Sequence, residues 1–299
     1  MKILITGGAG YIGYQLVREI NQLGIADEIR VYDNLSRVGL PFFTGEDKVK
    51  NLQFIRGDIL DTHTLQNALK GIDTVVHLAA FVSQPYNHLQ NLQYEQVNRW
   101  GSLNLSRLAR ETSTVKKAVY LSSSAVYGFR EDINATDNPT PNNAYGESKF
   151  QGEKYFSLLK DHCSSHIIRA GNVFGYNPCM RMDSVLNSWV FRALVEGKFV
   201  IYGSGEQIRA FVPVEEVTKK LTDAIVGEHT SDVETSISFC ASLNQIKDWL
   251  TASLPETEFN YLNRNQVFPS QNFPAHPLEG EHLKLLDRHL QRMKEELVL

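Results

Sequence analysis

The stretch Thr6-Gly7-Gly8-Ala9-Gly10-Tyr11-Ile12-Gly13 decides how this chain is expected to fold. The short apolar run Lys2-Ile3-Leu4-Ile5 precedes it and is typical of a buried parallel strand. From Tyr11 to Leu23, apolar residues follow at helical spacing. Strand, glycine-rich turn and helix are therefore consecutive, and the start of such a helix offers free N–H groups to an anion. The pattern predicts that this turn binds the diphosphate of a dinucleotide.

The glycines of this turn have separate expected tasks. Gly7 and Gly8 permit the tight turn, and Gly10 lets the backbone approach a pyrophosphate without a Cβ in the way. Gly13 lets the helix pack closely on the strand. The residues expected at the cofactor are those that form the turn and open the helix: Gly7, Gly10, Tyr11, Ile12 and Gly13.

An acid at the end of the second strand supports the same interpretation. Asp33 ends the run Ile29-Arg30-Val31-Tyr32 and lies 20 residues beyond Gly13. A carboxylate there hydrogen-bonds the adenosine ribose and repels a 2′-phosphate, which predicts NAD rather than NADP. Arg37 is the one nearby feature that points the other way. An ordinary glycine turn in an unrelated α/β protein is the alternative, and Asp33 counts against it.

Composition excludes several other classes of protein. A chain of 299 residues with 42% hydrophobic residues can bury a sizeable core without covalent staples. Its three cysteines, Cys163, Cys179 and Cys240, are widely spaced and form no CxxC or Cys/His pattern, so we predict neither disulfides nor a metal site. A net charge of −4 gives no electrostatic footprint for nucleic acid. With no signal-peptide pattern and no membrane-length apolar stretch, we expect a cytoplasmic protein.

Two further strands bring residues to the same expected site. The strand Leu52 to Gly57 ends in Asp58-Ile59, where the carboxylate can accept from an adenine amino group with Ile59 beneath the ring. Alternatively, Asp58 caps a helix that begins near Thr62. The strand beginning at Asp73 ends in the small residues Ala79 and Ala80, which allow close approach of the cofactor, so Leu78, Ala79 and Ala80 are expected at the cofactor. His77 precedes them, and a structural histidine is favoured over a catalytic base.

A serine-rich turn follows the fifth expected strand, Ala118 to Leu121. Its residues Ser122-Ser123-Ser124-Ala125-Val126-Tyr127-Gly128 place three hydroxyls at a carboxyl strand end, where ligands of doubly wound sheets bind. Tyr145 and Lys149 come next and share a helix face, so that the ammonium can favour the phenolate. A surface aromatic and lysine would show the same spacing, but the preceding motifs favour a base for a sugar or alcohol hydroxyl.

Taken together, these motifs resemble the extended short-chain dehydrogenase/reductase family, and within it the nucleotide-sugar epimerases and dehydratases. The resemblance covers nearly the whole chain. It implies NAD as cofactor, a nucleotide sugar as substrate, and Ser123 as the hydroxyl that hydrogen-bonds the reacting group, since it lies three positions before Val126. The motifs that carry it are Gly7 to Gly13, Asp33 to Ser36, Gly57 to Ile59, His77 to Ala80, Asn98 with Gly101 and Asn104, Ser122 to Gly128, and Tyr145 with Lys149. Asn34, Asn98, Ser122, Tyr145 and Lys149 thereby join the expected cofactor site.

The resemblance also assigns substrate residues in the later part of the chain. Asn172 matches an asparagine that helps bind the sugar nucleotide, and Arg209 matches an arginine that meets its diphosphate. Ala210 replaces the usual aspartate, so an exposed strand cation is the alternative for Arg209. The late Arg-x-Gly-Asp-like element of family members acting on UDP-sugars is missing between Phe259 and Leu299, which leaves the base unassigned.

We predict an α/β fold, a Rossmann-like doubly wound parallel sheet with a smaller substrate lobe. The NAD-binding domain is expected over residues 1–172 with a returning segment at about 203–236, and the lobe over 173–202 and 237–299. Pro269, Pro274 and Pro277 indicate an extended linker in that lobe, before an amphipathic helix that packs on it. The long helices around 91–110 and 145–160 are candidates for a homodimer contact.

The expected activity is epimerisation by transient oxidation of a sugar hydroxyl, at C4, with Ser123, Tyr145 and Lys149 as the catalytic residues. A keto-sugar reductase that uses NAD(P)H is the alternative enzyme, and a dinucleotide-sensing protein without catalysis is the alternative of another class. We predict against 4,6-dehydration, because related dehydratases carry carboxyl residues directly after the catalytic hydroxyl. Ser124 and Ala125 stand there in this chain, and Glu131 and Asp132 lie in a loop beyond.

Overall fold

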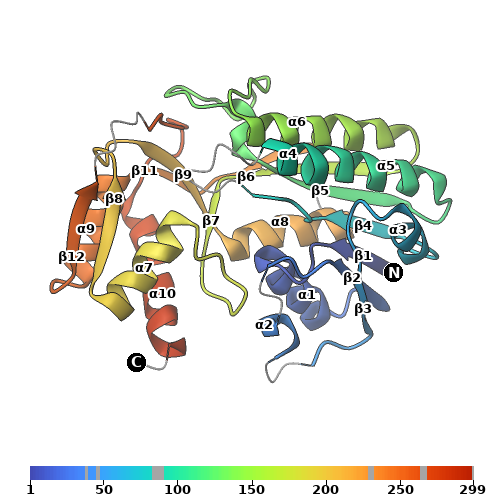
Figure 1. Cartoon of the computed structure of the whole chain (residues 1–299), viewed down its shortest axis with the longest axis horizontal. Coiled ribbons are helices and arrows are strands. Elements are labelled where there is room, and N and C mark those ends of the chain that lie inside the picture. Colours follow the sequence, from blue (N-terminus) through green and yellow to red (C-terminus); the bar gives the residue numbers. More distant parts are fainter. Residues whose placement is uncertain (38–39, 45–47, 83–90, 228–231, 263–267, 298–299) are drawn as a thin grey trace.

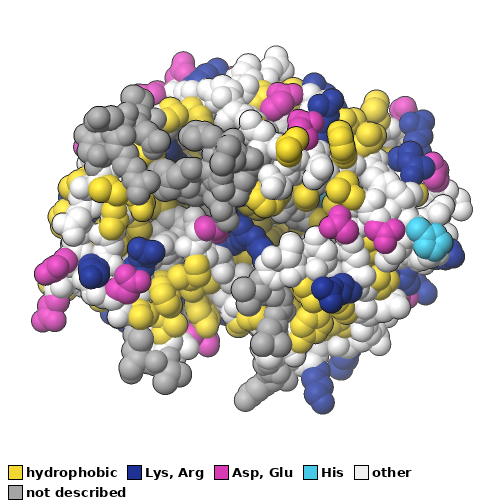
Figure 2. Space-filling view, in the orientation of Figure 1, with side chains coloured by type: hydrophobic (Ala, Val, Ile, Leu, Met, Phe, Trp, Pro, Cys, Tyr) yellow, Lys and Arg dark blue, Asp and Glu magenta, His cyan; other side chains and the backbone are white. Residues whose placement is uncertain are grey.

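The computed structural model of the chain describes residues 1–37, 40–44, 48–82, 91–227, 232–262 and 268–297. Figure 1 shows a large sheet covered by helices and, beside it, a smaller lobe that contains the last helix. On the face drawn in Figure 2, basic and acidic side chains are interspersed, as the small net charge leads one to expect.

Seven parallel strands form the large sheet, in the order β10-β6-β5-β4-β1-β2-β3. The direction of winding reverses between β1 and β4, as in doubly wound dinucleotide-binding sheets. The predicted fold class is therefore confirmed. The strands are β1 (Lys2–Thr6), β2 (Glu28–Asp33), β3 (Leu52–Arg56), β4 (Thr74–His77), β5 (Lys117–Ser123), β6 (Ser164–Ala170) and β10 (Val233–Ser236).

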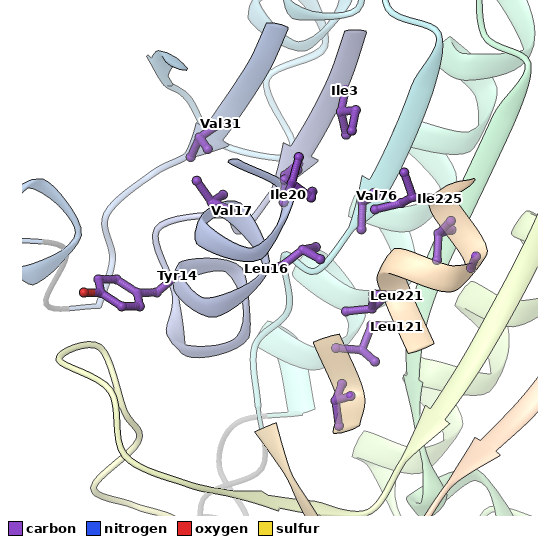
Figure 3. Close-up of a cluster of buried hydrophobic side chains, with 14 of the residues drawn as sticks. Ile3, Tyr14, Leu16, Val17, Ile20, Val31, Val76, Leu121, Leu221 and Ile225 are labelled. Carbon is purple, nitrogen blue, oxygen red and sulfur yellow. The ribbon is translucent and has the colours of Figure 1, made fainter. Parts of the chain in front are cut away.

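Helices cover both faces of this sheet because its strands are apolar on both. In β1, Ile3 and Ile5 belong to one buried cluster and Leu4 to the other, as the alternation of a strand requires. On the first face lie α1 (Tyr11–Leu23) and α8 (Val214–Val226), whose side chains meet those of the strands in Figure 3: Leu16, Val17, Ile20, Leu221 and Ile225 against Ile3, Val31 and Val76. On the second lie α3 (Thr62–Ala68), α5 (Gly101–Glu111) and α6 (Ala144–Ser157). The short helix α2 (Leu40–Phe43) packs on the first face, where Phe42 joins the same buried cluster as α1.

The helix predicted around 91–110 is present but changes type along its length. It begins as α4 (Asn91–Gln93), becomes a π-helix over Tyr94–Trp100 (η2) and continues as α5. A π-helical stretch inside an α-helix often marks a functional site. Asn98 lies in it and faces inward, with 1% of its surface exposed.

The smaller lobe has its own aromatic core, which includes Phe174, Phe211 and Phe239. The predicted stripe of the last helix packs there through Leu286, Leu290 and Met293. Its strands are β7 (Asn172–Phe174), β9 (Ile208–Pro213) and β11 (Phe239–Ser242) in one sheet, and β8 (Lys198–Tyr202) with β12 (Glu258–Leu262) in another. Its helices are α7 (Val185–Glu196), α9 (Leu243–Ser253) and α10 (Gly280–Glu296). After β9 the chain returns to the large sheet through α8 and β10.

The proline-containing segment before α10 is more than a connection. Phe273 is buried against Tyr127 at a ring-centroid distance of 5.5 Å. Gln271 is buried as well, and its amide lies against the turn that follows β5. The segment therefore carries part of the lobe onto the serine-rich turn.

Candidate active site

The glycine turn lies where the winding of the sheet reverses, at the carboxyl ends of β1 and β4. Gly7 has a φ of +72°, and a Cβ there would lie 2.5 Å from the backbone nitrogen of Ala79. A side chain at Gly7 would thus be both strained and obstructed by the residues after β4. These two conditions explain the glycine and show that Leu78 and Ala79 lie directly beside the turn.

The other glycines leave the start of α1 open to an anion. Gly10 is the N-cap residue, no described side chain caps it, and the first turn of α1 has no acidic residue. A Cβ built at Gly10 would have one neighbouring atom within 4 Å among the described residues, the Gly7 carbonyl oxygen at 3.2 Å. The start of α1 is therefore open on this side, where a diphosphate could approach. Gly13 packs differently from the prediction, because its Cβ would meet Gly8 Cα at 2.5 Å. Gly13 therefore lets α1 pack closely on the glycine turn and not on the strand.

Asp33 stands beside this turn at the end of β2. Its carboxylate accepts hydrogen bonds from the backbone N–H groups of Ala9 (3.1 Å) and Leu35 (2.8 Å). Burial raises the pKa of Asp33, and the two N–H groups oppose that rise. Each carboxylate oxygen retains a lone pair, so Asp33 can still accept from ribose hydroxyls. The residues present therefore fit the adenosine half of a dinucleotide.

Asp58 does not cap the helix that follows it. Its carboxylate accepts from Asn34 Nδ2 at 2.8 Å and from the backbone N–H of Leu60 at 2.9 Å. The N-cap of α3 is Asp61, which accepts from the Thr64 N–H. The capping alternative for Asp58 is wrong, and Asn34 and Asp58 form a joined polar edge at the ends of β2 and β3.

Three expected cofactor residues use their side chains elsewhere. The Asn98 amide holds the backbone of Phe81 through two hydrogen bonds of 2.7 and 2.8 Å, so it shapes the loop after β4. The Ser122 hydroxyl donates to the buried Glu153 carboxylate at 2.6 Å. The Tyr11 hydroxyl donates to the Gly175 carbonyl at 2.6 Å. The side chains of Asn98, Ser122 and Tyr11 thus form hydrogen bonds within the protein, and their assignment to the cofactor site stays a prediction.

His77 and Ile59 are likewise packed into the interior. His77 Nδ1 lies 2.7 Å from Thr6 Oγ1 and Nε2 lies 3.0 Å from Ser102 Oγ. Burial, with the nearby Lys149 charge, lowers the pKa of His77 well below its usual value. A neutral histidine with one hydrogen bond at each ring nitrogen agrees with the structural role expected for His77. Ile59 is buried against Gly101, where a Cβ would lie 2.7 Å from Ile59 Cγ2.

The serine turn and α6 bring the expected catalytic groups together. Ser123 ends β5, and its Oγ accepts from the Ala125 N–H at 3.2 Å, which fixes the short 3₁₀-helix Ser124–Tyr127. Gly146 allows α6 to approach this turn, since a Cβ there would lie 2.4 Å from the Ala125 carbonyl oxygen. As a result, Ser123 lies close enough to Tyr145 to lower the pKa of its phenol.

Lys149 lies one helical turn after Tyr145 and is 3% exposed. Its Nζ is 4.4 Å from the centroid of the Tyr120 ring. Burial lowers the pKa of Lys149 to about 7, and Glu153, four residues further along α6, opposes this shift. The ammonium is thus poised between its two forms, and nearby negative charge stabilises the protonated one.

A buried ion pair supports this end of α6. Glu153 receives two hydrogen bonds from Arg169 of β6, at 2.7 and 2.9 Å, and both residues are less than 10% exposed. Arg169 also donates to the Tyr127 hydroxyl at 3.0 Å. Sequence reasoning missed this pair because nothing local marks Glu153 or Arg169 as buried. Removal of either partner would leave an unpaired buried charge.

Arg181 is a second residue that sequence reasoning missed. It lies in the loop between β7 and α7, and its positive charge reaches Tyr145. Burial raises the pKa of Tyr145, whereas the Arg181 charge and the nearby Ser123 hydroxyl lower it. The same guanidinium is held by Asp183 through hydrogen bonds of 2.9 and 3.1 Å. Arg181 therefore favours the phenolate form that proton abstraction requires.

The expected substrate residues lie on the strands that lead into the lobe. Asn172 Nδ2 donates to the Ala210 carbonyl at 2.9 Å, which ties β7 to β9. Arg209 donates to the carbonyl oxygen of Pro269 at 2.7 Å and lies over the Phe129 ring. Both are half-buried at the junction of the lobe with the serine turn.

Ser124, beside the catalytic serine, is bonded to the lobe. Its hydroxyl donates to Gln271 Oε1 at 2.7 Å, and Gln271 Nε2 donates to the carbonyls of Ser124 (2.8 Å) and Gly128 (3.0 Å). Ser124 and Gln271 are both less than 5% exposed. The position after Ser123 is thus occupied by a hydroxyl that faces Gln271.

Within the described residues, no cluster of three or more His, Cys, Asp or Glu side chains is arranged to hold a metal ion. Among the same residues, no helix has both the length and the apolar character needed to cross a membrane.

Comparisons with known proteins agree with this geometry. A sequence profile described as the NAD dependent epimerase/dehydratase family matches residues 3–232. The chain is 31% identical over 239 residues to UDP-glucose 4-epimerase of Lactobacillus helveticus, which covers 73% of this chain and 69% of that protein. It is 27% identical over 242 residues to dTDP-D-glucose 4,6-dehydratase of Dictyostelium discoideum, with coverages of 72% and 53%.

The fold also matches solved structures over its full length. The crystal structure of UDP-glucuronic acid 4-epimerase from Bacillus cereus, in complex with UDP-glucuronic acid and NAD, superposes with a TM-score of 0.83. The match covers 99% of this chain and 100% of that chain at 23% sequence identity. At this identity the likeness establishes the fold and leaves the reaction to be argued from the site.

Proposed function

The chain belongs to the NAD-dependent epimerase/dehydratase family, and from this premise we propose that it is a nucleotide-sugar epimerase that transiently oxidises a sugar hydroxyl, at C4. The observation that carries the proposal is the close approach of α6 to the serine turn, which brings Tyr145 near Ser123, with the buried Lys149 one turn further along α6. Family members are enzymes that use NAD, and NAD supplies the acceptor for a hydride from the sugar carbon and the donor for its return.

In this proposal Tyr145 is the base and Ser123 orients the sugar. The Tyr145 phenolate takes the proton of the reacting hydroxyl, while Ser123 Oγ hydrogen-bonds the same oxygen. Lys149 stabilises the phenolate and holds the cofactor ribose. When the resulting keto-sugar turns over before it is reduced again, the product is the epimer, and Tyr145 returns the proton.

The proposal assigns the cofactor to the large sheet and the nucleotide sugar to the smaller lobe. We propose that Gly7, Gly10, Gly13 and Asp33 hold the ADP half of NAD, with the Asn34–Asp58 edge at the adenine. Residues 173–202 and 237–299, together with strand β9, then form the lobe for the nucleotide sugar, whose entrance is marked by Asn172 and Arg209.

The Ser124–Gln271 contact supports epimerisation over dehydration. Elimination of water needs an acid and a base next to the oxidised carbon. Ser124 donates to a buried amide and Ala125 has no ionisable group, while Glu131 and Asp132 are exposed in the loop beyond. One-carbon oxidation and reduction requires none of these groups, so Ser123, Tyr145 and Lys149 suffice for it.

We expect products with the same mass as their substrates. The purified protein is incubated with UDP-, GDP-, dTDP- and CDP-hexoses, and the products are analysed by mass spectrometry and separated from their epimers by chromatography. An isobaric epimer supports the proposal. Loss of one water at a catalytic rate would overturn it, and a gain of two hydrogens on an added keto-sugar without epimerisation would establish the reductase alternative instead.

Arg181→Gln is expected to move the acidic limb of the pH profile of kcat to higher pH. The wild-type guanidinium lowers the pKa of Tyr145 against the effect of burial, so its removal raises that pKa and delays phenolate formation. The measurement is kcat against pH for this variant and for Arg192→Gln, which changes an exposed arginine on α7. An unmoved acidic limb in Arg181→Gln would show that this charge does not act on the base.

We also propose a homodimer through α4, η2, α5 and α6. Hydrophobic side chains project outward there, with Leu92 72% and Trp100 54% exposed. Light scattering is expected to give a dimeric mass for the wild-type protein and a monomeric mass for Trp100→Glu. Leu23→Glu, at a residue of α1 on the other face of the sheet that is 57% exposed, should leave the mass unchanged. A monomeric wild-type protein would refute the contact.

A further inference from the structure

The loop between β7 and α7 contacts two parts of the proposed cofactor site. The Tyr11 hydroxyl at the start of α1 donates to Gly175, and Asn177 Nδ2 donates back to the Tyr11 carbonyl at 3.2 Å. At its other end, Asp183 accepts a hydrogen bond from Arg37 at 3.0 Å. Figure 1 shows this loop reaching from the lobe toward α1. The loop therefore spans the region from the phosphate-binding helix to the residues after β2.

The middle of the loop lies close to the ribose-binding carboxylate. Burial raises the pKa of Cys179 to about 11, and the Asp33 charge adds to that rise. Cys179 also packs with the hydrophobic cluster beneath α1. Two independent contacts, at Tyr11 and at Arg37, thus bring the loop past Asp33 on the adenosine side of the site.

Arg37 is placed where an NADP-binding arginine would be useful. It follows Asp33 by four residues on the same connection, and a guanidinium after the second strand can accommodate the 2′-phosphate of NADP. In this structure Arg37 instead donates a hydrogen bond to the Asp183 carboxylate. The Asp183 carboxylate is shared between Arg37 and Arg181, and although burial opposes the shift, the two guanidinium groups hold the pKa of Asp183 down to about 2.

We propose that Asp183 is a specificity-determining residue that enforces the preference for NAD over NADP by neutralising Arg37. This inference rests on the cofactor site of the proposed function and adds to that site Asp183, a residue of the loop between β7 and α7. Asp33 repels the 2′-phosphate directly, whereas Asp183 withholds the arginine that would attract it. Discrimination thus depends on two carboxylates that lie 150 residues apart in the chain.

The proposal predicts a pattern of cofactor affinities that a purely structural role of Asp183 would not produce. Asp183→Asn leaves the side-chain shape and frees Arg37, so NADP⁺ should bind more tightly relative to NAD⁺ by about tenfold or more, the usual worth of a charge-assisted hydrogen bond. Arg37→Ala alone should leave the ratio of the two dissociation constants nearly unchanged, because Arg37 is already engaged. The double variant Arg37→Ala/Asp183→Asn should return the ratio to that of the wild type.

The experiment is equilibrium dialysis of the purified full chain and its variants against NAD⁺ or NADP⁺, with thermal unfolding as the check on folding. Asp223→Asn, which releases the exposed Lys219 of α8, is the matched control and should leave the ratio unchanged. An unchanged ratio in folded Asp183→Asn, or a strong rise in NAD⁺ preference in Arg37→Ala, would overturn this inference and leave the proposed cofactor site standing. Failure of the wild type to bind either nucleotide would overturn the proposed cofactor site and this inference with it.

Discussion

Tyr145→Phe is expected to lower kcat by about three orders of magnitude or more while the protein still binds NAD, because only the proton acceptor is lost. The ring that packs against Tyr94, at a centroid distance of 5.7 Å, remains in the variant. Only the hydroxyl near Ser123 is lost. The measurements are turnover of the nucleotide sugar and the dissociation constant of NAD.

Tyr155→Phe is the matched control for this variant. Tyr155 lies on the same helix, and its hydroxyl accepts a hydrogen bond from Arg99 at 3.4 Å. The control should keep near wild-type turnover. If Tyr145→Phe also kept it, the phenolate mechanism would be wrong, whatever its effect on cofactor affinity.

Lys149→Ala is expected to lose both turnover and cofactor affinity, with kcat lowered by about 10²- to 10⁴-fold. The buried ammonium lies over the Tyr120 ring and near Glu153, and no exposed cation of α6 can replace it. Its loss removes the positive charge that favours the phenolate and the group proposed to hold the cofactor ribose. Binding of NAD and single-turnover kinetics separate the two effects.

Lys154→Ala changes an exposed lysine of the same helix and should leave both quantities unchanged. Thermal unfolding of both variants is compared with that of the wild type, since Glu153 loses a positive neighbour in the first. A folded Lys149→Ala protein that kept full turnover would contradict the assigned role of this ammonium.

The parts of the site that could be predicted from sequence are those with a local cause. Gly7 is required by its own backbone angle and by the neighbouring strand end, so the glycine appears in the sequence wherever that turn is built. Tyr145 and Lys149 share a helix face because of their spacing alone. Such features can be recognised before any contact is known.

The parts that could not be predicted depend on contacts between distant segments. Ser124 meets Gln271 across 147 residues, and Arg37 meets Asp183 across 146. No periodicity or spacing in the chain encodes these pairs, since the packing of the lobe on the sheet creates them. Sequence likewise does not show that the side chains of Asn98 and Ser122 form hydrogen bonds inside the protein.

Transient oxidation at C4 is the central claim, and one isotope measurement tests it directly. The nucleotide hexose that turns over in the product screen is prepared with deuterium at C4 and incubated with the protein in ordinary water. We predict slower turnover than with the unlabelled sugar and an epimer that retains the deuterium, because hydride leaves and returns without exchange with solvent. Loss of the label to water, or turnover at an unchanged rate with a product lighter by one water, would contradict the account.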